Sequence, residues 1–442
     1  MEELHKIFQE NILESMSEGI MVVGFDGVMR YANPSALELL GFEEKELMGK
    51  TFASLFFNDP ENDDFSQVVI DAITDRNNEH KAVVIYRRGK DTLHLHVRSS
   101  FLVDTKERKG IIVVISDLSE LTETRDAFGR FLSDDIVKQL LDTPDGLKLG
   151  GKKQTLTIMM SDLRGFTAMS ERMDATDLIS MLNHYLGEMT EVIQARKGTI
   201  IEFIGDGILA IFGAPEETPD HATNAVAAAL EMQDRMESIN KWNSERGYPV
   251  LEMGIGLNTG EVIVGNIGSE KRTKYGVVGS QVNLCGRIES YTVGGQILIS
   301  QSTCDLVNSE LEVSKMMTVY PKGARGELVL SHITGIGEPY NIHVHMIESV
   351  LQQLENPIAV SFRKLEGKHE IKKSMYGGLT AVARDAAFME TEAELEVYDN
   401  ILINAGGKLF CKITDKTDKG YELQYTSVPT GYAGWLKDAR SS

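Results

Sequence analysis

Two apolar segments that each end at a carboxylate constrain the fold of this chain more than any other feature. Residues 155–161 run into Asp162, and residues 201–204 run into Gly205-Asp206-Gly207. Apolar, β-branched runs of this length predict buried strands. If both strands end at one edge of a sheet, the two acids form an oxygen-ligand site suited to Mg²⁺ or Mn²⁺. Each acid alone also fits a local role, Asp162 as a helix cap and Asp206 in a hairpin turn.

The net charge limits the partners that the chain can bind. Its 442 residues include 45 Lys and Arg against 66 Asp and Glu, which gives a net charge of −21. An acidic chain binds nucleic acid and anionic membranes poorly, so we expect no nucleic acid and no membrane as partners. A polyanionic substrate must then be bound through metal ions and a local cluster of basic residues.

Cysteine usage and the N-terminal sequence predict a cytoplasmic protein. Cys285, Cys304 and Cys411 are widely scattered, without metal-ligand spacing or a disulfide framework. Free thiols of this kind are typical of a reducing compartment. The first residues are polar and amphipathic instead of signal-like, and no apolar run approaches the length of a membrane span.

Residues 1–116 are predicted to begin with a short amphipathic helix over about residues 1–15, followed by short strands and a second helix. The pattern, with segments 31–36, 39–42 and 46–50, resembles a PAS sensor domain. This resemblance implies either a small-molecule pocket or a surface used only for dimerisation. The PAS ligand stays unassigned: residues 1–284 contain no cysteine for a flavin adduct, and His94 and His96 favour a solvated role over haem ligation. Strands are expected at 19–25, 27–32, 81–87, 92–101 and 110–116, and a helix at 33–40.

A continuous helix is expected between residues 117 and 141. Its apolar residues recur at steps of three and four, which is typical of a helix that packs against a neighbour. In a dimer, that neighbour can be the same helix of the twin chain. Pro144 and the glycines that follow it end the pattern, so residues 117–150 are predicted to form a signalling helix and linker.

Strands and helices alternate through residues 151–345, which predicts an α+β domain with its helices on one face of a sheet. Residues 350–442 contain short strands and are predicted to form a separate β-rich domain, such as a small barrel. Its pattern faintly resembles a PilZ-type barrel but lacks the paired arginines, so it is assigned no ligand. Within 151–345, strands are expected at 154–161, 199–204, 207–213, 251–258, 260–267 and 296–300, and helices at 166–196, 219–244, 281–291 and 301–309.

Asn283 and Arg287 are four residues apart on a predicted helix, so both project from one face of it. An amide and a guanidinium on one face can hold a ribose oxygen and a phosphate in fixed geometry. The simpler alternative is a surface ion pair between Arg287 and Glu289.

Lys271, Arg272 and Lys274 form a compact basic cluster in this acidic chain. Such a cluster is a natural partner for the terminal phosphates of a nucleotide. The alternative is a loop of solvated basic residues with no ligand.

Taken together, these blocks resemble class III nucleotidyl cyclases over roughly residues 130–345. Segments 161–167, 204–207 and 282–289 match signatures of that family in order and spacing, and segment 128–137 adds a helical entry. The resemblance implies a ferredoxin-like catalytic domain. It also implies a head-to-tail homodimer in which each active site is shared between two chains.

The resemblance assigns a role to each candidate residue. Asp162 and Asp206 of one chain would hold two Mg²⁺ or Mn²⁺ ions. Asn283 of the other chain would orient the ribose, and Arg287 would stabilise charge on the α-phosphate while the 3′ oxygen attacks it and pyrophosphate leaves. The β and γ phosphates would be bound by Lys271 or Arg272, and by Lys322.

The family selects its purine at two positions, which here are Glu202 and Gly276. An ionised glutamate only accepts hydrogen bonds, which suits the N1–H and 2-amino donors of guanine, whereas it would face an acceptor at N1 of adenine. Gly276 departs from the pattern of both guanylate and adenylate cyclases, because it has no side chain to read guanine O6. We therefore expect a PAS-regulated guanylate cyclase that makes cyclic GMP from GTP. An adenylate cyclase that uses ATP, and an inactive nucleotide-sensing scaffold, are the alternatives.

Overall fold

The computed structural model forms two compact units, residues 1–132 and residues 133–442. None of the helices in the described part is apolar over a length that could cross a bilayer. Most of the helix expected at 117–141, and Lys322, lie outside the described residues. The structure describes residues 11–57, 59–74, 79–104, 107–120, 122, 136, 148–320, 326–344, 350–366, 369–371, 373–429 and 431–441.

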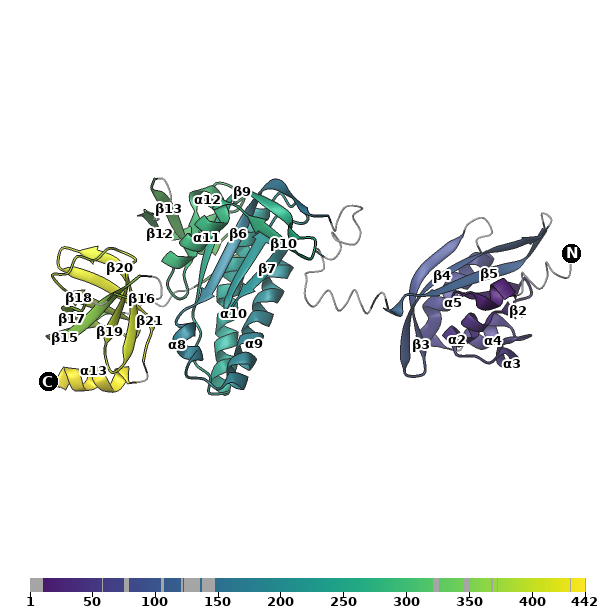
Figure 1. The fold of residues 1–442 in the computed structure, drawn as a ribbon, viewed down its shortest axis with the longest axis horizontal. Helices are drawn as coiled ribbons and strands as arrows, with labels where there is room; N and C mark the ends of the chain where they lie inside the picture. The colour runs from purple at the N-terminus through teal and green to yellow at the C-terminus, as the bar shows by residue number, and fades with distance from the viewer. Residues whose placement is uncertain are drawn as a thin grey trace. The chain divides into compact units, whose positions relative to one another are not determined.

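The first unit has the antiparallel sheet and the helix near residues 33–40 that the PAS-like pattern predicts, together with further helices that the pattern did not indicate (Figure 1). The five strands follow the order β2-β1-β5-β4-β3. Helices α2 (Pro34–Leu40) and α5 (Asp63–Thr74) pack against this sheet. The short helices α3 (Glu44–Leu47) and α4 (Phe52–Phe56) lie between them in sequence. The strands are β1 (Gly19–Gly24), β2 (Met29–Ala32), β3 (His80–Arg88), β4 (Asp91–Asp104) and β5 (Glu107–Asp117).

One buried amide fixes the start of α2. The side-chain oxygen of Asn33 accepts hydrogen bonds from the backbone amides of Ile20 and Ala36, which joins β1 to the first turn of the helix. On β4, Leu95 and Val97 lie in the core. His94 and His96 alternate with these core residues and so project from the opposite face of the sheet.

A nine-stranded sheet forms the centre of the second unit. Strand β6 (Gly150–Leu163) pairs with β9 (Met253–Ser269) on one side and with β8 (Gly207–Phe212) on the other. The hairpin partner of β8 is β7 (Gly198–Ile204). The other strands are β10 (Arg272–Val278), which pairs with β9, and β11 (Ile297–Ser300), β12 (Leu311–Val319), β13 (Leu328–Ile336) and β14 (Ile342–His343).

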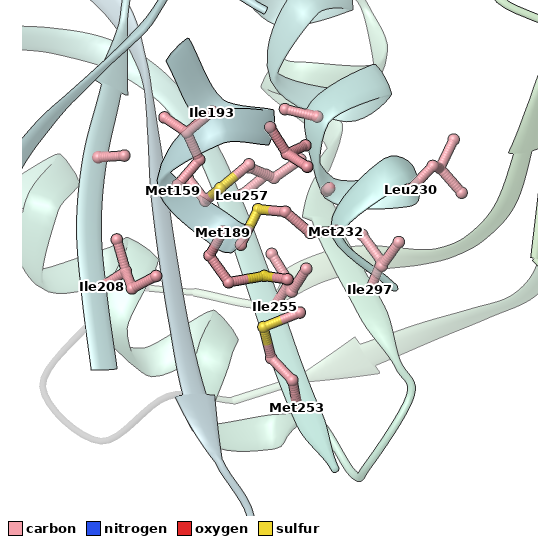
Figure 2. Packing of buried hydrophobic residues seen from close by; sticks show 14 of the residues in the cluster. Met159, Met189, Ile193, Ile208, Leu230, Met232, Met253, Ile255, Leu257 and Ile297 are labelled. Carbon is pink, nitrogen blue, oxygen red and sulfur yellow. The ribbon is translucent and has the colours of Figure 1, made fainter. Parts of the chain in front are cut away.

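Two long helices, α9 (Ala175–Ala195) and α10 (His221–Glu245), pack on one face of this sheet (Figure 1). The core between sheet and helices is rich in methionine, as Figure 2 shows for Met189 and Met232 from the helices and for Met159 and Met253 from the strands. Methionine side chains are flexible enough to fill irregular gaps between a twisted sheet and straight helices.

A third helix, α11 (Ser280–Tyr291), lies on the opposite face, so the expectation that all helices share one face is wrong. Ile255 and Leu257 of β9 point into the α9–α10 core, whereas Gly256 between them faces α11. A Cβ built at Gly256 would lie 2.4 Å from the backbone nitrogen of Glu289. The helix backbone therefore rests directly on the strand, and only glycine permits this approach.

The helix expected at 166–196 is divided in two. The short helix α8 (Phe166–Ser170) is followed by a turn, and α9 begins after Asp174. The Asp174 carboxylate accepts a hydrogen bond from the amide of Thr176 and so caps the new helix. An aspartate inside a helical pattern can be such a boundary, and here it is one.

The two strands expected at 251–258 and 260–267 form a single strand, β9. Glycine at position 260 indicates a break in the sequence pattern, yet Gly260 stays extended and pairs with Leu156 of β6. A Cβ built there would lie 2.7 Å from Cγ of Gln281, so this glycine makes room for a side chain of α11 and does not form a turn. The short helix α12 (Gln301–Cys304) ends five residues earlier than expected.

The C-terminal strands form a closed barrel, which confirms the predicted β-rich domain. The sheet order is β16-β15-β17-β18-β21-β20-β19, and an additional pairing of β15 with β19 closes it. Helix α13 (Tyr432–Ser441) follows the last strand. The strands are β15 (Gln352–Glu366), β16 (His369–Glu370), β17 (Met375–Val382), β18 (Ala386–Glu390), β19 (Asn400–Asn404), β20 (Lys408–Thr417) and β21 (Gly420–Ser427).

Replacing Gly256 with alanine tests the contact between β9 and α11. The added methyl group meets helix backbone, so Gly256→Ala is expected to destabilise the protein by about 1–3 kcal/mol. Gly187→Ala on α9 is the matched control, because nothing lies within 4 Å of a Cβ built there. This control is expected to stabilise by up to about 1 kcal/mol through helix propensity. Thermal unfolding measures both, and equal melting temperatures for the two variants would contradict the close approach.

Candidate active site

The pairing of β6 with β8 brings the two predicted acids together. Ser161 lies opposite Ile208 in this ladder, so Asp162 lies beside the β7–β8 turn that carries Asp206. The backbone amide of Leu163 donates to Oδ2 of Asp206 at 3.1 Å, and the negative charge of Asp162 acts on the Asp206 carboxyl. Asp162 does not cap a helix, because the N-cap of α8 is Gly165.

The electrostatics of this pair suit a cation. Burial and the negative charge of Asp162 raise the pKa of Asp206 to about 6, while backbone N–H groups oppose that shift. A divalent ion would remove the repulsion between the carboxylates. In the described part of the chain, no group of three or more His, Cys, Asp or Glu side chains is placed to bind a metal. Further ligands would come from water or substrate phosphates, as is usual for Mg²⁺.

Asn283 and Arg287 lie on the side of α11 that faces away from the sheet. Cys285 and Ile288 of the same helix are fully buried against the strands, whereas Asn283 is exposed and Arg287 half-buried. Neither side chain makes a hydrogen bond or an ion pair with another described residue. Both are therefore available to a ligand that approaches from outside this chain.

Sequence reasoning missed a buried ion pair next to the acids. Arg164 donates to the carboxylate of Glu289, and its guanidinium also donates to Oγ1 of Thr292 at 3.1 Å. Burial raises the pKa of Glu289, and the charge of Arg164 opposes that effect. The pair links the loop after Asp162 to the end of α11. The predicted alternative, an ion pair between Arg287 and Glu289, is wrong because Glu289 binds Arg164 instead.

The two predicted base-selecting positions, Glu202 and Gly276, lie on β7 and β10, two strands of one sheet that do not pair with each other. Glu202 of β7 forms an ion pair with Lys274 of β10, whose Nζ donates to the Glu202 carboxylate at 2.8 Å. Gly276 is two residues further along β10 and therefore on the same face as Lys274. A Cβ built at Gly276 would meet only Cδ1 of Ile267 at 3.7 Å and Cε of Lys274 at 4.0 Å. Lys274 thus faces Glu202, although the sequence pattern placed it with the phosphate-binding cluster.

The remaining basic candidates lie far from the acids of the same chain. Lys271 and Arg272 are exposed at the turn between β9 and β10. In the β6–β9 ladder, Asp162 pairs with Gly254, whereas the turn lies beyond Asn266 at the other end. Lys271 and Arg272 therefore lie at the opposite end of the β6–β9 ladder from Asp162.

Two family models match the chain. "Adenylate and Guanylate cyclase catalytic domain" matches residues 151–371, which is half of the chain, and "PAS fold" matches residues 8–118. The chain therefore belongs to the adenylate and guanylate cyclase family and carries an N-terminal PAS domain. Its catalytic domain is that of a class III nucleotidyl cyclase.

The similar proteins include some that are named adenylate cyclases and some that are named guanylyl cyclases. Adenylate cyclase 1 of Rhizobium meliloti is 28% identical over 229 residues, 50% of this chain and 34% of that protein. The adenylate cyclase of Anabaena cylindrica is 33% identical over 198 residues, 42% of this chain and 37% of that protein. The solved structure of the guanylyl cyclase Cya2 is 51% identical, with a TM-score of 0.44, and covers 45% of this chain and 100% of its own. The chain thus spans about a third of the length of these two curated relatives.

Asp206→Asn tests the electrostatics of the acid pair in metal-free protein. The pKa of Asp206 is higher in the folded protein than in the unfolded chain, so its charge destabilises the fold above about pH 6. Asp206→Asn should raise the melting temperature in EDTA at neutral pH. The gain should shrink as the pH falls from about 6 to below about 4, where the wild-type carboxyl is protonated in both states.

The matched control is Asp234→Asn, because Asp234 is an exposed acid on α10. Its effect on the melting temperature should be small and should not change over this pH range. A gain for Asp206→Asn that is equally independent of pH would contradict the coupling of the two carboxyl groups.

Proposed function

We propose that this member of the family is a guanylate cyclase that converts GTP to cyclic GMP and pyrophosphate. It works as a homodimer with two divalent metal ions at each site, and the PAS domain regulates it. The observation that carries the choice of GTP is the ion pair between Glu202 and Lys274 beside Gly276. An acceptor and a donor 2.8 Å apart match the edge of guanine.

The hydrogen-bonding groups of this pair suit guanine and not adenine. The Glu202 carboxylate can accept from N1–H and the 2-amino group, and the Lys274 ammonium can donate to O6. Gly276 supplies no side chain for O6, so Lys274 takes that role. Both side chains are about half exposed, at 58% for Lys274 and 48% for Glu202. An exposed ion pair contributes little by itself, so it can open to bind the base at little cost.

Adenine would bind this pair poorly. Its N1 is an acceptor and would face the Glu202 carboxylate, and its 6-amino donor would face the Lys274 ammonium. Each polar group that the bound base buries without a partner costs about 1–3 kcal/mol, which is enough for roughly ten- to hundredfold discrimination.

The chain's own residues divide the work of cyclisation. Asp162 and Asp206 would hold the metal ions, which lower the pKa of the ribose 3′-hydroxyl and neutralise the phosphates. Asn283 orients the ribose. The 3′ oxygen forms a bond to the α-phosphorus as the bond to the pyrophosphate oxygen breaks, and the hydroxyl proton passes to solvent. Arg287 stabilises the charge that grows on the α-phosphate in the transition state.

The directions of these side chains favour a site shared by two chains. Asp162 lies at the end of β6, within the sheet, whereas Asn283 and Arg287 point away from that sheet. Lys271 and Arg272 lie at the other end of β9. A second copy, arranged head to tail, would present its α11 and its β9–β10 turn to the acids of the first.

The choice of base can be tested with Glu202→Lys in the full chain. With Mn²⁺, the wild-type protein should turn over GTP faster than ATP. Glu202→Lys should lower GTP turnover roughly ten- to hundredfold, because two acceptors for guanine are lost, and should raise the ATP-to-GTP ratio. Glu216→Lys, an exposed glutamate of the same domain, is the control and should leave the ratio unchanged.

Three results would count against the proposal. Faster ATP turnover by the wild-type protein would make it an adenylate cyclase. An unchanged ratio in Glu202→Lys would place Glu202 outside the base pocket. Nucleotide binding without turnover of GTP or ATP would make the domain a nucleotide-sensing scaffold.

Mixing two inactive variants tests whether the site is shared. Asp162→Ala and Arg287→Ala should each be inactive alone. Mixed in equal amounts, they should regain about a quarter of the wild-type activity, because half of the dimers are heterodimers with one intact site of two. Asp162→Ala mixed with Asp206→Ala is the control and should stay inactive, since both changes affect the same half-site. Equal activity in the two mixtures would contradict the shared geometry.

A further inference from the structure

One lysine on the outside of the C-terminal barrel is buried. Along β20, Leu409, Cys411 and Ile413 point into the barrel core. Lys412 lies between them and must point outward, yet it is only 3% exposed. A lysine on an outer barrel face normally keeps its ammonium in water. Another part of the same compact unit therefore covers Lys412.

The cover is the C-terminal end of α11. The Lys412 ammonium donates to the backbone oxygen of Ser290 at 2.6 Å and to that of Thr292 at 2.7 Å. The last carbonyl groups of a helix have no partners within the helix and carry partial negative charge, so a cation there is favourable. Burial and the charge of Arg164 lower the pKa of Lys412 to about 7, whereas Glu289 and Asp162 act in the opposite direction.

The barrel also touches the loop that follows Asp162. A Cβ built at Gly165 would lie 2.7 Å from the backbone oxygen of Thr426 and 2.9 Å from Cβ of Ser427, both on β21. Gly165 has a φ of +69°, so any other residue would be strained there as well. The barrel backbone thus lies directly against the turn between Asp162 and α8.

A third contact involves an aromatic pair. The ring of Tyr398 lies edge-on to Tyr291, the last residue of α11, with 5.0 Å between ring centroids. Its hydroxyl donates to Sδ of Met317 on β12 at 2.8 Å. The barrel therefore contacts the end of α11 at two points, through a buried charge and through an aromatic ring.

These contacts converge on the two catalytic elements of the domain. The loop after Asp162 and the end of α11 are already joined by Arg164 and Glu289. Arg287 is only three residues before Ser290, whose carbonyl accepts from Lys412. If the last turn of α11 were free to move, the guanidinium of Arg287 would move with it.

We propose that Lys412 is a positioning residue for cyclisation, and that through it the C-terminal barrel sets the turnover of the catalytic domain. The inference rests on the proposed function, because the position of Arg287 matters only if a nucleotide is cyclised. Lys412 itself touches neither the substrate nor the metal ions. It fixes the helix end, so that Arg287 meets the α-phosphate in the transition state. A misplacement of about 1 Å in such a group costs up to about a hundredfold in rate.

The test compares Lys412→Met with the wild type in the full chain, using GTP and ATP with Mn²⁺. The methionine keeps most of the volume but leaves two carbonyl groups without a donor. We expect kcat to fall about tenfold or more, while KM changes by less than about twofold, because an interaction made in the transition state is lost. Lys412→Arg keeps a cationic donor and should recover part of the lost kcat.

Lys416→Met is the matched control, since Lys416 lies on the same strand but is exposed. Its kcat and KM should equal those of the wild type. All variants are compared below their melting temperatures, so that partial unfolding is not mistaken for slower turnover. A folded Lys412→Met protein with the wild-type kcat would overturn the inference.

A second variant keeps the inference testable if Lys412→Met does not fold. Tyr398→Ala removes the ring that packs on Tyr291 without leaving a buried charge or an empty charge site. Like Lys412→Met, it should lower kcat and leave KM nearly unchanged. An unchanged kcat would count against a role for the barrel.

Hydrogen exchange separates a failure of this inference from a failure of the proposed function. In Lys412→Met, the amides of residues 289–292 and 163–166 should exchange faster than in the wild type, whereas Lys416→Met should show no change. If the wild type turns over neither GTP nor ATP, the proposed function fails and the exchange rates still report whether Lys412 holds both elements. Unchanged exchange in both segments would overturn the inference.

Discussion

Strand β6 pairs along its length with β9 and near its end with β8, and these two ladders place most groups of the candidate site. The pairing with β8 puts Asp162 beside the turn that carries Asp206. The pairing with β9 puts Gly256 under α11, which determines how closely that helix can lie on the sheet. A shift of one residue in either ladder would turn Asp162 to the opposite face, because side chains alternate along a strand.

The sequence was most informative where a short local pattern carries the signal. Strands that end at Asp162 and Asp206, the face shared by Asn283 and Arg287, and the PAS and barrel strand patterns could all be predicted. The split between α8 and α9 was missed because Asp174 resembles a surface residue of one long helix until its capping contact is seen. The continuity of β9 was missed because Gly260 indicates a turn when its packing against Gln281 is unknown.

Contacts between distant segments could not be predicted. Arg164 and Glu289 are 125 residues apart, and Lys412 lies 120 residues from Thr292. No local periodicity distinguishes such residues from ordinary surface charges. Lys274 is a similar case, because its neighbours in sequence are basic residues of a turn, whereas its neighbour in space is Glu202 on another strand. Each of these charged side chains acquires its role only after the strands have paired.

Charge is unevenly distributed between the interior and the surface of the second unit. The chain as a whole is strongly acidic, but the cations Arg164 and Lys412 are buried at the end of α11, where Arg164 pairs with Glu289 and Lys412 donates to the backbone oxygen of Ser290. Removing one member of such a set leaves the others uncompensated, which is far more costly than never having buried them. The stability of the region between the sheet, α11 and the barrel therefore depends on all of these charges being present together.

The contact at Gly165 limits the size of the residues that meet there more than their chemical character. The nearest barrel atom there is a backbone oxygen, which every amino acid at position 426 would supply equally. Strand β21 can therefore vary its side chain at that point without altering the interface, whereas the opposing loop position admits no side chain at all. Among homologous proteins that share this contact, the residue at position 426 should therefore vary, whereas position 165 should remain glycine.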